Sequence, residues 1–215
     1  MNEKTKRMCT MGMLCAVAYL MVVIVRIPII YFLKYEPKDV VITIGGLIYG
    51  PAASVLISII VSLIEMFTIS ETGIWGLIMN ILSTCAFSCT AAWIYKRKKT
   101  MSGAIMGLVV GCVVMVAVML LWNYLITPIY MGYPRETVAG MLVPAFLPFN
   151  LFKGGLNAAI TLMLYKPVVS ALRRASLLPA SDGKGAAGKR LGMLPVALVI
   201  LVTSVLILLV MKGMI

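Results

Sequence analysis

The chain has 215 residues, of which 62% are hydrophobic and only 12% are charged, and its mean hydropathy is +1.06. No soluble domain of this size has such a balance, so the composition excludes one and predicts an all-α integral membrane protein. The net charge of +12 comes from basic residues that cluster at the ends of apolar runs. That placement is typical of membrane topology, and we expect the lipid bilayer, with no nucleic acid, as the main partner surface.

Seven apolar runs, separated by prolines, glycines or charges, predict seven helices. The first is a retained span, because no signal-peptide cleavage site follows its basic start. The chain then divides into a six-span membrane bundle over residues 1–174, a flexible basic linker over 175–192 and an additional C-terminal transmembrane helix within 193–215. The helices are expected over residues 8–27, 40–49, 52–69, 74–95, 102–127, a sixth ending near 173–174, and 193–211.

The charges of the loops predict the orientation of the bundle. With the N-terminus in the cytoplasm, the run Lys96–Lys99 and the pair Arg173 and Arg174 also lie inside. The opposite loops are neutral or acidic. One of them, the mixed segment at residues 29–40, leads into the second helix, where Pro37 is placed as a first-turn residue. A multi-pass membrane protein with its N-terminus in the cytoplasm follows.

Catalytic and nucleotide-binding signatures are missing from the sequence. It has no histidine, no intramembrane pair of carboxylates and no G-x-S-x-G motif. The segment GKGAAGKR at 183–190 has P-loop spacing but lacks the following Ser or Thr and follows no strand. We therefore expect no enzyme, no metal and no cofactor, and binding or transport is favoured.

The stretch PAFLPFNLFKGGLN places Asn150, Lys153 and Asn157 on one face of the sixth helix. A lysine inside an apolar helix is costly and faces a partner, a pathway or a ligand. If Pro148 begins the regular helix, Asn150 and Lys153 lie in its first turns, where free N–H groups favour electron-rich oxygen. A structural ion pair between Lys153 and Glu65 is the alternative.

Other polar residues belong to the same outward half of the bundle. Asn80 and Asn123 lie there, and Tyr124 lies near the outer end of the fifth helix, where interfacial anchoring is its ordinary role. On the first helix, Gly12 and Ala16 form a small-residue face. Such a face allows another helix to approach closely, either within the bundle or from a partner subunit.

Several segments resemble a known family. FLKYEPKDVVITIGGLIYGP is similar to the first loop and second helix of the substrate-binding S components of energy-coupling-factor (ECF) vitamin transporters. In the riboflavin-specific members the loop carries a run that here is Leu33, Lys34, Glu36 and Asp39. NYLITPIYMG, PFNLFKGG and the pair Tyr165-Lys166 also resemble that subgroup. The resemblance covers about residues 8–174.

This resemblance implies a six-helix S-component bundle that binds riboflavin near the outer face. It implies hydrogen bonds to the ligand from Asn123, Asn150 and Lys153, with the loop from Lys34 to Asp39 as lid. A membrane coupling subunit, contacted through the Gly12/Ala16 face, and two cytosolic ATPases would supply the energy. The additional C-terminal helix departs from the family pattern. The ligand-binding residues expected on both grounds are Lys34, Glu36, Asp39, Glu65, Asn80, Asn123, Tyr124, Asn150 and Lys153.

Two other functions remain open at this stage. The same fold could bind another vitamin, such as folate or pantothenate. A membrane scaffold without a ligand is the alternative from a different class.

Overall fold

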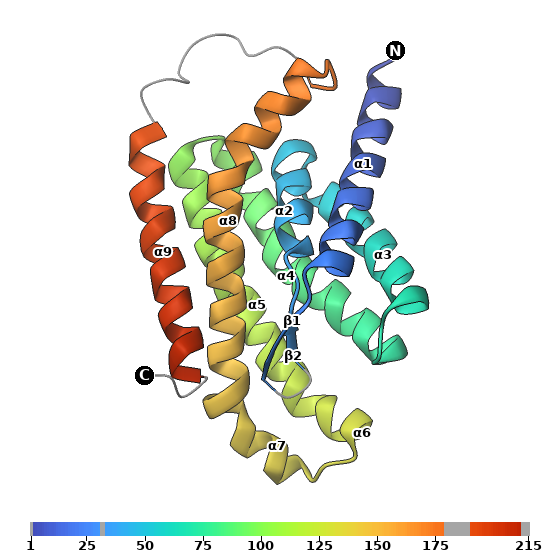
Figure 1. Ribbon diagram of the computed structural model, residues 1–215, viewed down its shortest axis with the longest axis vertical. Coiled ribbons are helices and arrows are strands. Elements are labelled where there is room, and N and C mark those ends of the chain that lie inside the picture. The colour runs from blue at the N-terminus through green and yellow to red at the C-terminus, as the bar shows by residue number, and fades with distance from the viewer. Residues whose placement is uncertain (1, 31–32, 179–189, 212–215) are drawn as a thin grey trace.

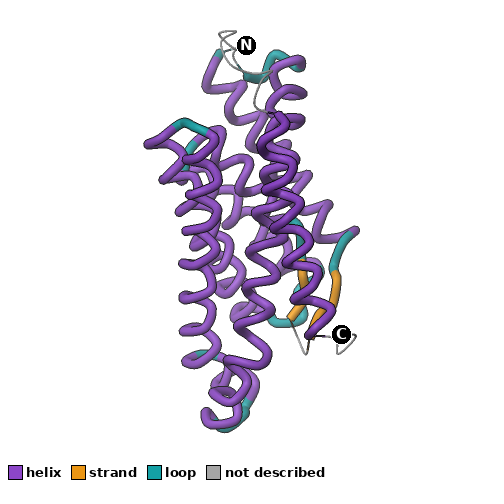
Figure 2. Tube along the Cα trace, turned by 90° about the vertical axis from the view of Figure 1, so that its left-hand side faces the viewer, coloured by secondary structure: helices purple, strands orange, loops and turns teal. Residues whose placement is uncertain are grey.

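The computed structural model describes residues 2–30, 33–178 and 190–211, and these form an elongated bundle of helices (Figures 1 and 2). A two-stranded antiparallel hairpin, β1 (Ile27–Ile30) and β2 (Leu33–Tyr35), follows the first helix. The helices are α1 (Glu3–Ile24), α2 (Lys38–Tyr49), α3 (Pro51–Thr68), α4 (Gly73–Lys98), α5 (Met101–Leu125), α6 (Thr127–Met131), α7 (Arg135–Met141), the π-helical turn η1 (Leu142–Phe146), α8 (Leu147–Arg174) and α9 (Arg190–Met211).

Five helical segments of the described residues are long and apolar enough to cross a membrane. They are α1, α3, α4, α5 and the continuous helical segment Arg135–Arg174. Helix α2 has 12 residues, and the apolar segment Ala197–Leu209 of α9 is also shorter than a span. The prediction of an all-helical membrane protein is confirmed. The crossing of the bilayer by α2 and by α9 stays a prediction.

Helix α2 lies at the centre of the bundle, between α1, α3, α4 and α8. Nine of its twelve residues are buried, including Lys38 and Asp39 in its first turn. Gly46 allows α3 to approach closely, because a Cβ at this position would overlap the hydroxyl of Ser54. The helix ends at Gly50, whose φ of 95° favours glycine, and Pro51 then starts α3. This short central helix therefore carries two charges into the interior.

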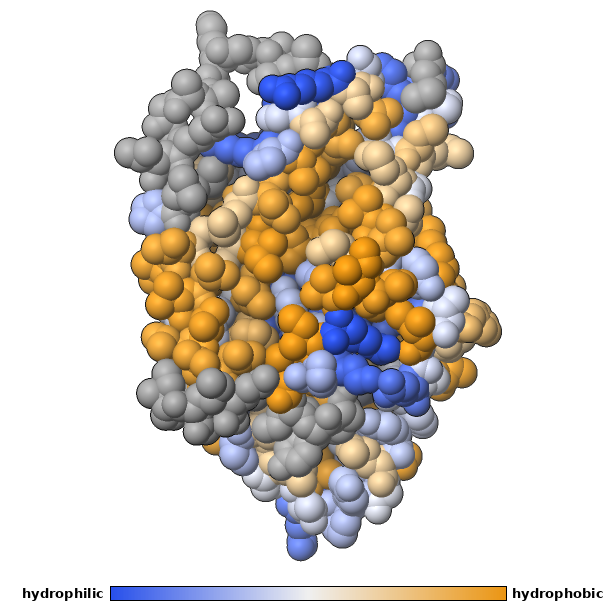
Figure 3. Space-filling view, in the orientation of Figure 1, coloured by the Kyte–Doolittle hydropathy of each residue, from blue (hydrophilic) through white to orange (hydrophobic). Residues whose placement is uncertain are grey.

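On the face drawn in Figure 3, apolar side chains cover most of the middle of the bundle, polar groups lie at its top and bottom, and a further polar patch interrupts the apolar surface in the lower half. Phe67, Val113 and Ile24 are 79%, 63% and 75% exposed, as expected for surfaces that face lipid rather than water. The start of α1 and the ends of α2, α4 and α8 lie at one end of the bundle, and the hairpin lies toward the other (Figure 1). We call these the basic end, after Arg7, Lys96, Lys99 and Arg173, and the hairpin end.

The structure differs from the predicted elements in several places. The segment expected as a loop at 29–40 contains part of the hairpin. Pro37 occupies the N-cap position, one residue before α2, and not its first turn. Helix α4 continues through Lys98, within the basic run. Helix α5 ends at Leu125, and Pro128 lies in the first turn of α6. Most of the predicted linker and the P-loop-like segment lie outside the described residues.

Candidate ligand-binding site

A cavity of about 80 Å³ opens at the hairpin end, between the hairpin, α3, α4, α5 and α8. Its apolar walls come from four side chains, and the rest of its lining is polar or charged. The apolar residues are Leu33, Met79, Met119 and Phe149. The polar residues are Arg26, Lys34, Glu36, Glu65, Glu71, Thr72, Asn80, Ser83, Asn150 and Lys153.

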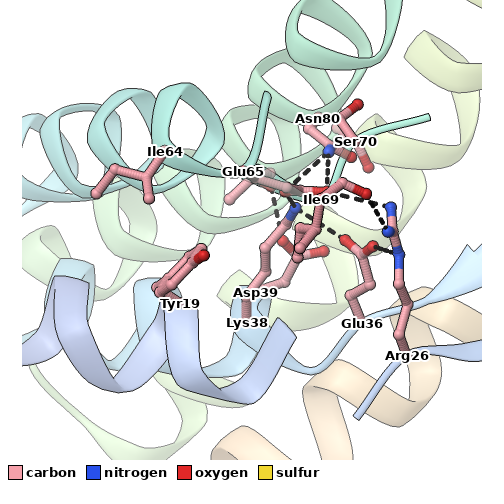
Figure 4. A network of polar contacts seen from close by, with 12 residues as sticks. Tyr19, Arg26, Glu36, Lys38, Asp39, Ile64, Glu65, Ile69, Ser70 and Asn80 are labelled. Atoms are coloured by element: carbon pink, nitrogen blue, oxygen red, sulfur yellow. Dashed lines mark hydrogen bonds and ion pairs between the residues drawn. The ribbon is translucent and has the colours of Figure 1, made fainter. Parts of the chain in front are cut away.

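Two buried carboxylates, Glu36 and Glu65, are held together by cations on one side of the cavity (Figure 4). The Lys38 ammonium contacts Glu36 Oε2 at 2.8 Å and also pairs with Glu65 Oε2. The Arg26 guanidinium lies 2.9 Å from Glu36 Oε1 and 3.6 Å from Glu65 Oε1. Asn80 Nδ2 donates to both oxygens of Glu65 at 3.2 Å. The carboxylates are therefore fully paired.

The third buried carboxylate, Asp39, is paired by residues of α4 and α8. Lys153 Nζ lies 3.0 Å from Asp39 Oδ2, and Asn157 Nδ2 donates to the same oxygen at 3.3 Å. Thr84 Oγ1 donates to Asp39 Oδ1 at 2.6 Å. Tyr35, from β2, donates to Asn157 Oδ1 at 3.0 Å, which ties the hairpin to this group.

Three cations and three carboxylates thus balance one another beneath the cavity. Breaking such a buried pair is expensive because the remaining charge loses its partner, so the network fixes its side chains in place. The cations are Arg26, Lys38 and Lys153, and the carboxylates are Glu36, Asp39 and Glu65. A ligand entering the cavity would therefore meet fixed hydrogen-bonding groups, and the charges of these six side chains would cancel.

Some hydrogen-bonding capacity on the cavity wall is left over. An ammonium has three N–H donors, and Lys153 uses them toward Asp39 and, at 3.3 Å, Ser83 Oγ. One donor of Lys153 remains. Asn150 Nδ2 donates to the Phe146 carbonyl at 2.7 Å, while its Oδ1 accepts no hydrogen bond from the described residues. Both side chains can therefore bind a polar ligand edge without breaking their structural contacts.

The rim of the cavity is closed by an exposed ion pair. Lys34 Nζ on β2 lies 2.7 Å from Glu71 Oε2 in the turn between α3 and α4. The hydrogen bond and charge of Lys34 hold the pKa of Glu71 below its ordinary value. This contact bridges the hairpin and the α3–α4 turn, with Glu71 in contact with solvent.

Glu36 lies in the loop before α2 and has a perturbed pKa. Burial alone would raise the pKa of Glu36. The charge and hydrogen bond of Lys38, with the charges of Lys153 and Arg26, outweigh that effect and lower the pKa below its ordinary value. Glu36 is thus held as a carboxylate.

Six of the nine predicted ligand residues line the cavity, and three do not. Lys34, Glu36, Glu65, Asn80, Asn150 and Lys153 line it. Asp39 lies outside the lining and pairs with Lys153. Asn123 is buried and donates to the Met119 carbonyl at 2.7 Å. Tyr124 is 38% exposed, and Arg135 lies over its ring at 5.7 Å. Contacts of these three residues with a ligand stay predictions.

The alternative partner proposed for Lys153 is corrected by the geometry. Its carboxylate is Asp39, whereas Glu65 is paired with Lys38 and Arg26. The expected helix start also differs. Regular α8 begins at Leu147, next to Pro148, but η1 continues directly into it, so its first turn is not an open helix end.

Sequence reasoning missed Arg26, which was interpreted only as the end of the first helix. It lies beyond α1, and its Nη1 donates to the Ile69 carbonyl at 2.8 Å. Sequence reasoning also missed Met79, Met119 and Phe149. Apolar residues in apolar helices carry no sequence signal that separates a cavity wall from ordinary packing.

The predicted interface on α1 is placed on the outside of the bundle. Gly12 and Ala16 are exposed, and a Cβ at Gly12 would meet nothing within 4 Å. Leu20, 53% exposed, extends the same face by one turn. This face is free to contact another helix, and its role as a subunit interface stays a prediction.

Comparisons with known proteins agree on one family. A family model described as the substrate-specific component of ECF transporters matches residues 6–165. A riboflavin transporter RibU of Staphylococcus aureus (strain TCH60) is 28% identical over 182 residues, which are 80% of this chain and 95% of that protein. The riboflavin transporter FmnP of Bacillus subtilis (strain 168) is 26% identical over 189 residues, covering 81% and 99%.

The fold comparison gives the same result. A solved structure described as the S component of a bacterial ECF transporter superposes with a TM-score of 0.67 and 28% sequence identity. The match covers 80% of this chain and 99% of that one.

Proposed function

The chain belongs to the substrate-specific components of ECF transporters, and on this premise we propose that it is a high-affinity riboflavin-binding subunit. It is a transporter component and not an enzyme. The proposal is that the chain captures riboflavin at the outer face of a prokaryotic cell membrane. ATP-driven uptake would then be carried out by a membrane coupling subunit and two cytosolic ATPases.

The chemistry of the cavity wall is the observation that carries the choice of ligand. Two methionines, a phenylalanine and a leucine provide apolar surface, and the spare donor of Lys153 and the free acceptor of Asn150 provide polar edges. Ligand sites with mostly apolar walls and a few placed polar groups select ligands by shape and edge pattern. A flat heterocycle with carbonyl and N–H edges, such as the ring system of riboflavin, suits these walls.

The relatives support the same ligand. Both named relatives are riboflavin transporters, and their similarity extends over nearly all of their length. At 28% identity or less a relative's name does not fix the substrate, so the proposal also rests on the cavity residues.

Binding requires the cavity to open. Its volume of about 80 Å³ is well below the roughly 300–1,000 Å³ of small-molecule sites. The hairpin is the movable wall that we propose, because the pair of Lys34 with Glu71, which joins β2 to the α3–α4 turn at the rim, is exposed. Opening would break this pair, while Tyr35 keeps β2 tied to Asn157 and the pairs of Lys38 and Lys153 stay in place.

The orientation follows from charge. We propose that the basic end faces the cytoplasm, as the positive-inside rule requires, and that the hairpin end faces outward. Helix α2 would then complete a six-helix bundle, and α9 would be one additional span. The exposed α1 face with Gly12 and Ala16 would contact the coupling subunit.

A panel of vitamins tests the proposal. Riboflavin, flavin mononucleotide, folate and pantothenate should be compared by thermal shift of the detergent-purified protein, with native mass spectrometry reporting any copurified ligand. Selective stabilisation by riboflavin supports the assignment. Stabilisation by folate or pantothenate alone would keep the family and replace the vitamin, and an unliganded protein that only copurifies with a partner would favour a scaffold.

A further inference from the structure

A second pocket lies at the basic end of the bundle, opposite the end that holds the cavity described above. Helices α4 and α8 line both, but with residues from opposite ends. Its volume is about 420 Å³, and it is formed where α2, α4 and α8 end. Tyr49, Tyr95 and Tyr165 line it together with the cations Lys96, Lys99 and Arg173. No acidic residue is among the described residues that line it.

The cations of this pocket differ from those of the ligand site. Every cation around the first cavity lies within 4.0 Å of a carboxylate. By contrast, the side chains of Lys96, Lys99 and Arg173 make no salt bridge or hydrogen bond within residues 2–30, 33–178 and 190–211. Three helix C-termini nearby contribute about −0.5 charge each, which three full positive charges exceed. The pocket is therefore electropositive.

The tyrosine hydroxyls supply neutral donors beside this charge. Tyr49 Oη is buried and has no hydrogen-bond partner in the described part of the chain. The hydroxyls of Tyr95 and Tyr165 lie 3.1 Å apart, so one donates to the other and one hydrogen is left over. An unsatisfied buried hydroxyl is costly, so Tyr49 and the remaining hydrogen of the Tyr95–Tyr165 pair are available to a ligand with acceptor oxygens.

Apolar residues adjoin the polar groups. Leu47, Ile48 and Val169 line the same pocket. A neighbouring hollow of about 250 Å³ shares Tyr49 and adds Lys4, Lys6 and Arg7 from α1, together with Glu3, which pairs with Lys6. Basic pockets between membrane helices are known to bind the head groups of anionic lipids. A phosphate with an attached apolar chain matches this combination better than a small inorganic ion.

We propose that the pocket at the basic end binds the phosphate group of an anionic phospholipid. The Lys96, Lys99 and Arg173 side chains pair with the phosphate, and Tyr49 donates its hydroxyl to a phosphate oxygen. The lipid joins the ends of α2, α4 and α8, and so it stabilises the central helix from the end opposite the riboflavin site. This site is independent of the identity of the vitamin.

The test compares two variants of equal charge. The pocket variant combines Lys96→Gln, Lys99→Gln and Arg173→Gln, and the control variant combines Arg97→Gln, Lys98→Gln and Arg174→Gln. Both lose three positive charges from the same helix ends, but the control residues do not line the pocket. Circular dichroism and gel filtration establish that each variant is folded, and Tyr49→Phe serves as a third variant with no change of charge.

Binding of phosphatidylglycerol and phosphatidylcholine is measured by native mass spectrometry and thermal shift of the full chain, with inorganic phosphate in a parallel arm. We expect selective retention of phosphatidylglycerol. The affinity of the pocket variant for phosphatidylglycerol should fall on the order of 10- to 100-fold, and that of Tyr49→Phe should fall several-fold. The control variant should keep the affinity of the parent. Equal loss in both triple variants would overturn the proposal, because net charge alone would explain it. Equal stabilisation by inorganic phosphate would overturn the lipid as the source of the phosphate.

Discussion

Lys153 Nζ on α8 lies 3.0 Å from Asp39 Oδ2 in the first turn of α2, and both side chains are buried. This pair connects the central helix to the helix that carries the most polar intramembrane stretch of the sequence. Because Lys153 also lines the cavity, the contact links the stability of the bundle to the ligand site.

Replacement of Asp39 by Asn should destabilise the protein strongly. It leaves the Lys153 ammonium without a carboxylate in the interior, and breaking one partner of a buried pair costs about 3–5 kcal/mol. Thermal unfolding in detergent should show a large fall in Tm. The matched control, Glu71→Gln, removes a carboxylate from an exposed pair and should leave Tm almost unchanged.

The double variant Asp39→Asn/Lys153→Met separates structure from binding. Removing both charges should recover much of the lost stability, because no unpaired charge remains. Riboflavin affinity should nevertheless stay about 10- to 150-fold weaker, the value of one lost hydrogen bond to a charged donor. Recovery of full affinity in the double variant would show that Lys153 has only a structural role.

Stability should fall in acid in a way that depends on Glu36. Its pKa is lowered in the folded protein, so its contribution is fully present above the unfolded value of about 4.3 and is lost as the pH falls through the lower folded value. Glu36→Gln should therefore have a lower Tm at pH 7 and a flatter Tm profile between neutral pH and pH 3. Parallel profiles of variant and parent would contradict this role.

The contact between α8 and α9 depends on Gly155. A Cβ at this position would overlap the hydroxyl of Ser204 on α9, so Gly155→Ala should cost about 1–3 kcal/mol through overpacking. The second substitution Ser204→Ala removes the obstructing oxygen and should restore most of the Tm. No described residue of α9 lines the ligand cavity, so riboflavin affinity should change little in either variant. A Tm unaffected by Gly155→Ala would show that α9 does not dock in this position.

The exposed α1 face should matter for assembly and not for capture. Gly12→Leu with Ala16→Leu adds bulk where nothing in the bundle is displaced, so the isolated protein should bind riboflavin unchanged. Copurification with the coupling subunit and ATPases should fall sharply, because small residues permit the close approach of helices. The control Val109→Leu changes an exposed residue of α5 and should leave assembly intact.

The sequence predicted the helices well where strong local signals exist. The break at Gly50 and Pro51, the basic run in the last turn of α4 and the apolar spans all follow from short-range chemistry. The hairpin was missed because its strands have only four and three residues, and β-propensity depends on neighbours that the sequence does not order. α6 and α7 were hidden by prolines in a segment that was interpreted as a loop.

The charged residues of the site were recognised individually, but their pairing was not. Three cations, of which Lys38 and Lys153 are buried, and three buried carboxylates allow many pairings, and only the packing of α2 against α3, α4 and α8 selects among them. Glu65 was named as the alternative partner of Lys153 for this reason, whereas Arg26 and Lys38 pair with that carboxylate in the structure. The prediction nevertheless included Asn80, Asn150 and Lys153, which line the cavity. Polar groups in apolar helices are costly, and this cost marks them as candidates for a functional site.

Titration of riboflavin fluorescence with the purified full-length protein is the most direct test of the central claim. The account predicts stoichiometric quenching at nanomolar protein, a yellow preparation from cells supplied with the vitamin, and weaker quenching when Asn150→Ala or Lys153→Ala is introduced. A colourless, folded protein that does not quench riboflavin at micromolar concentration would contradict it.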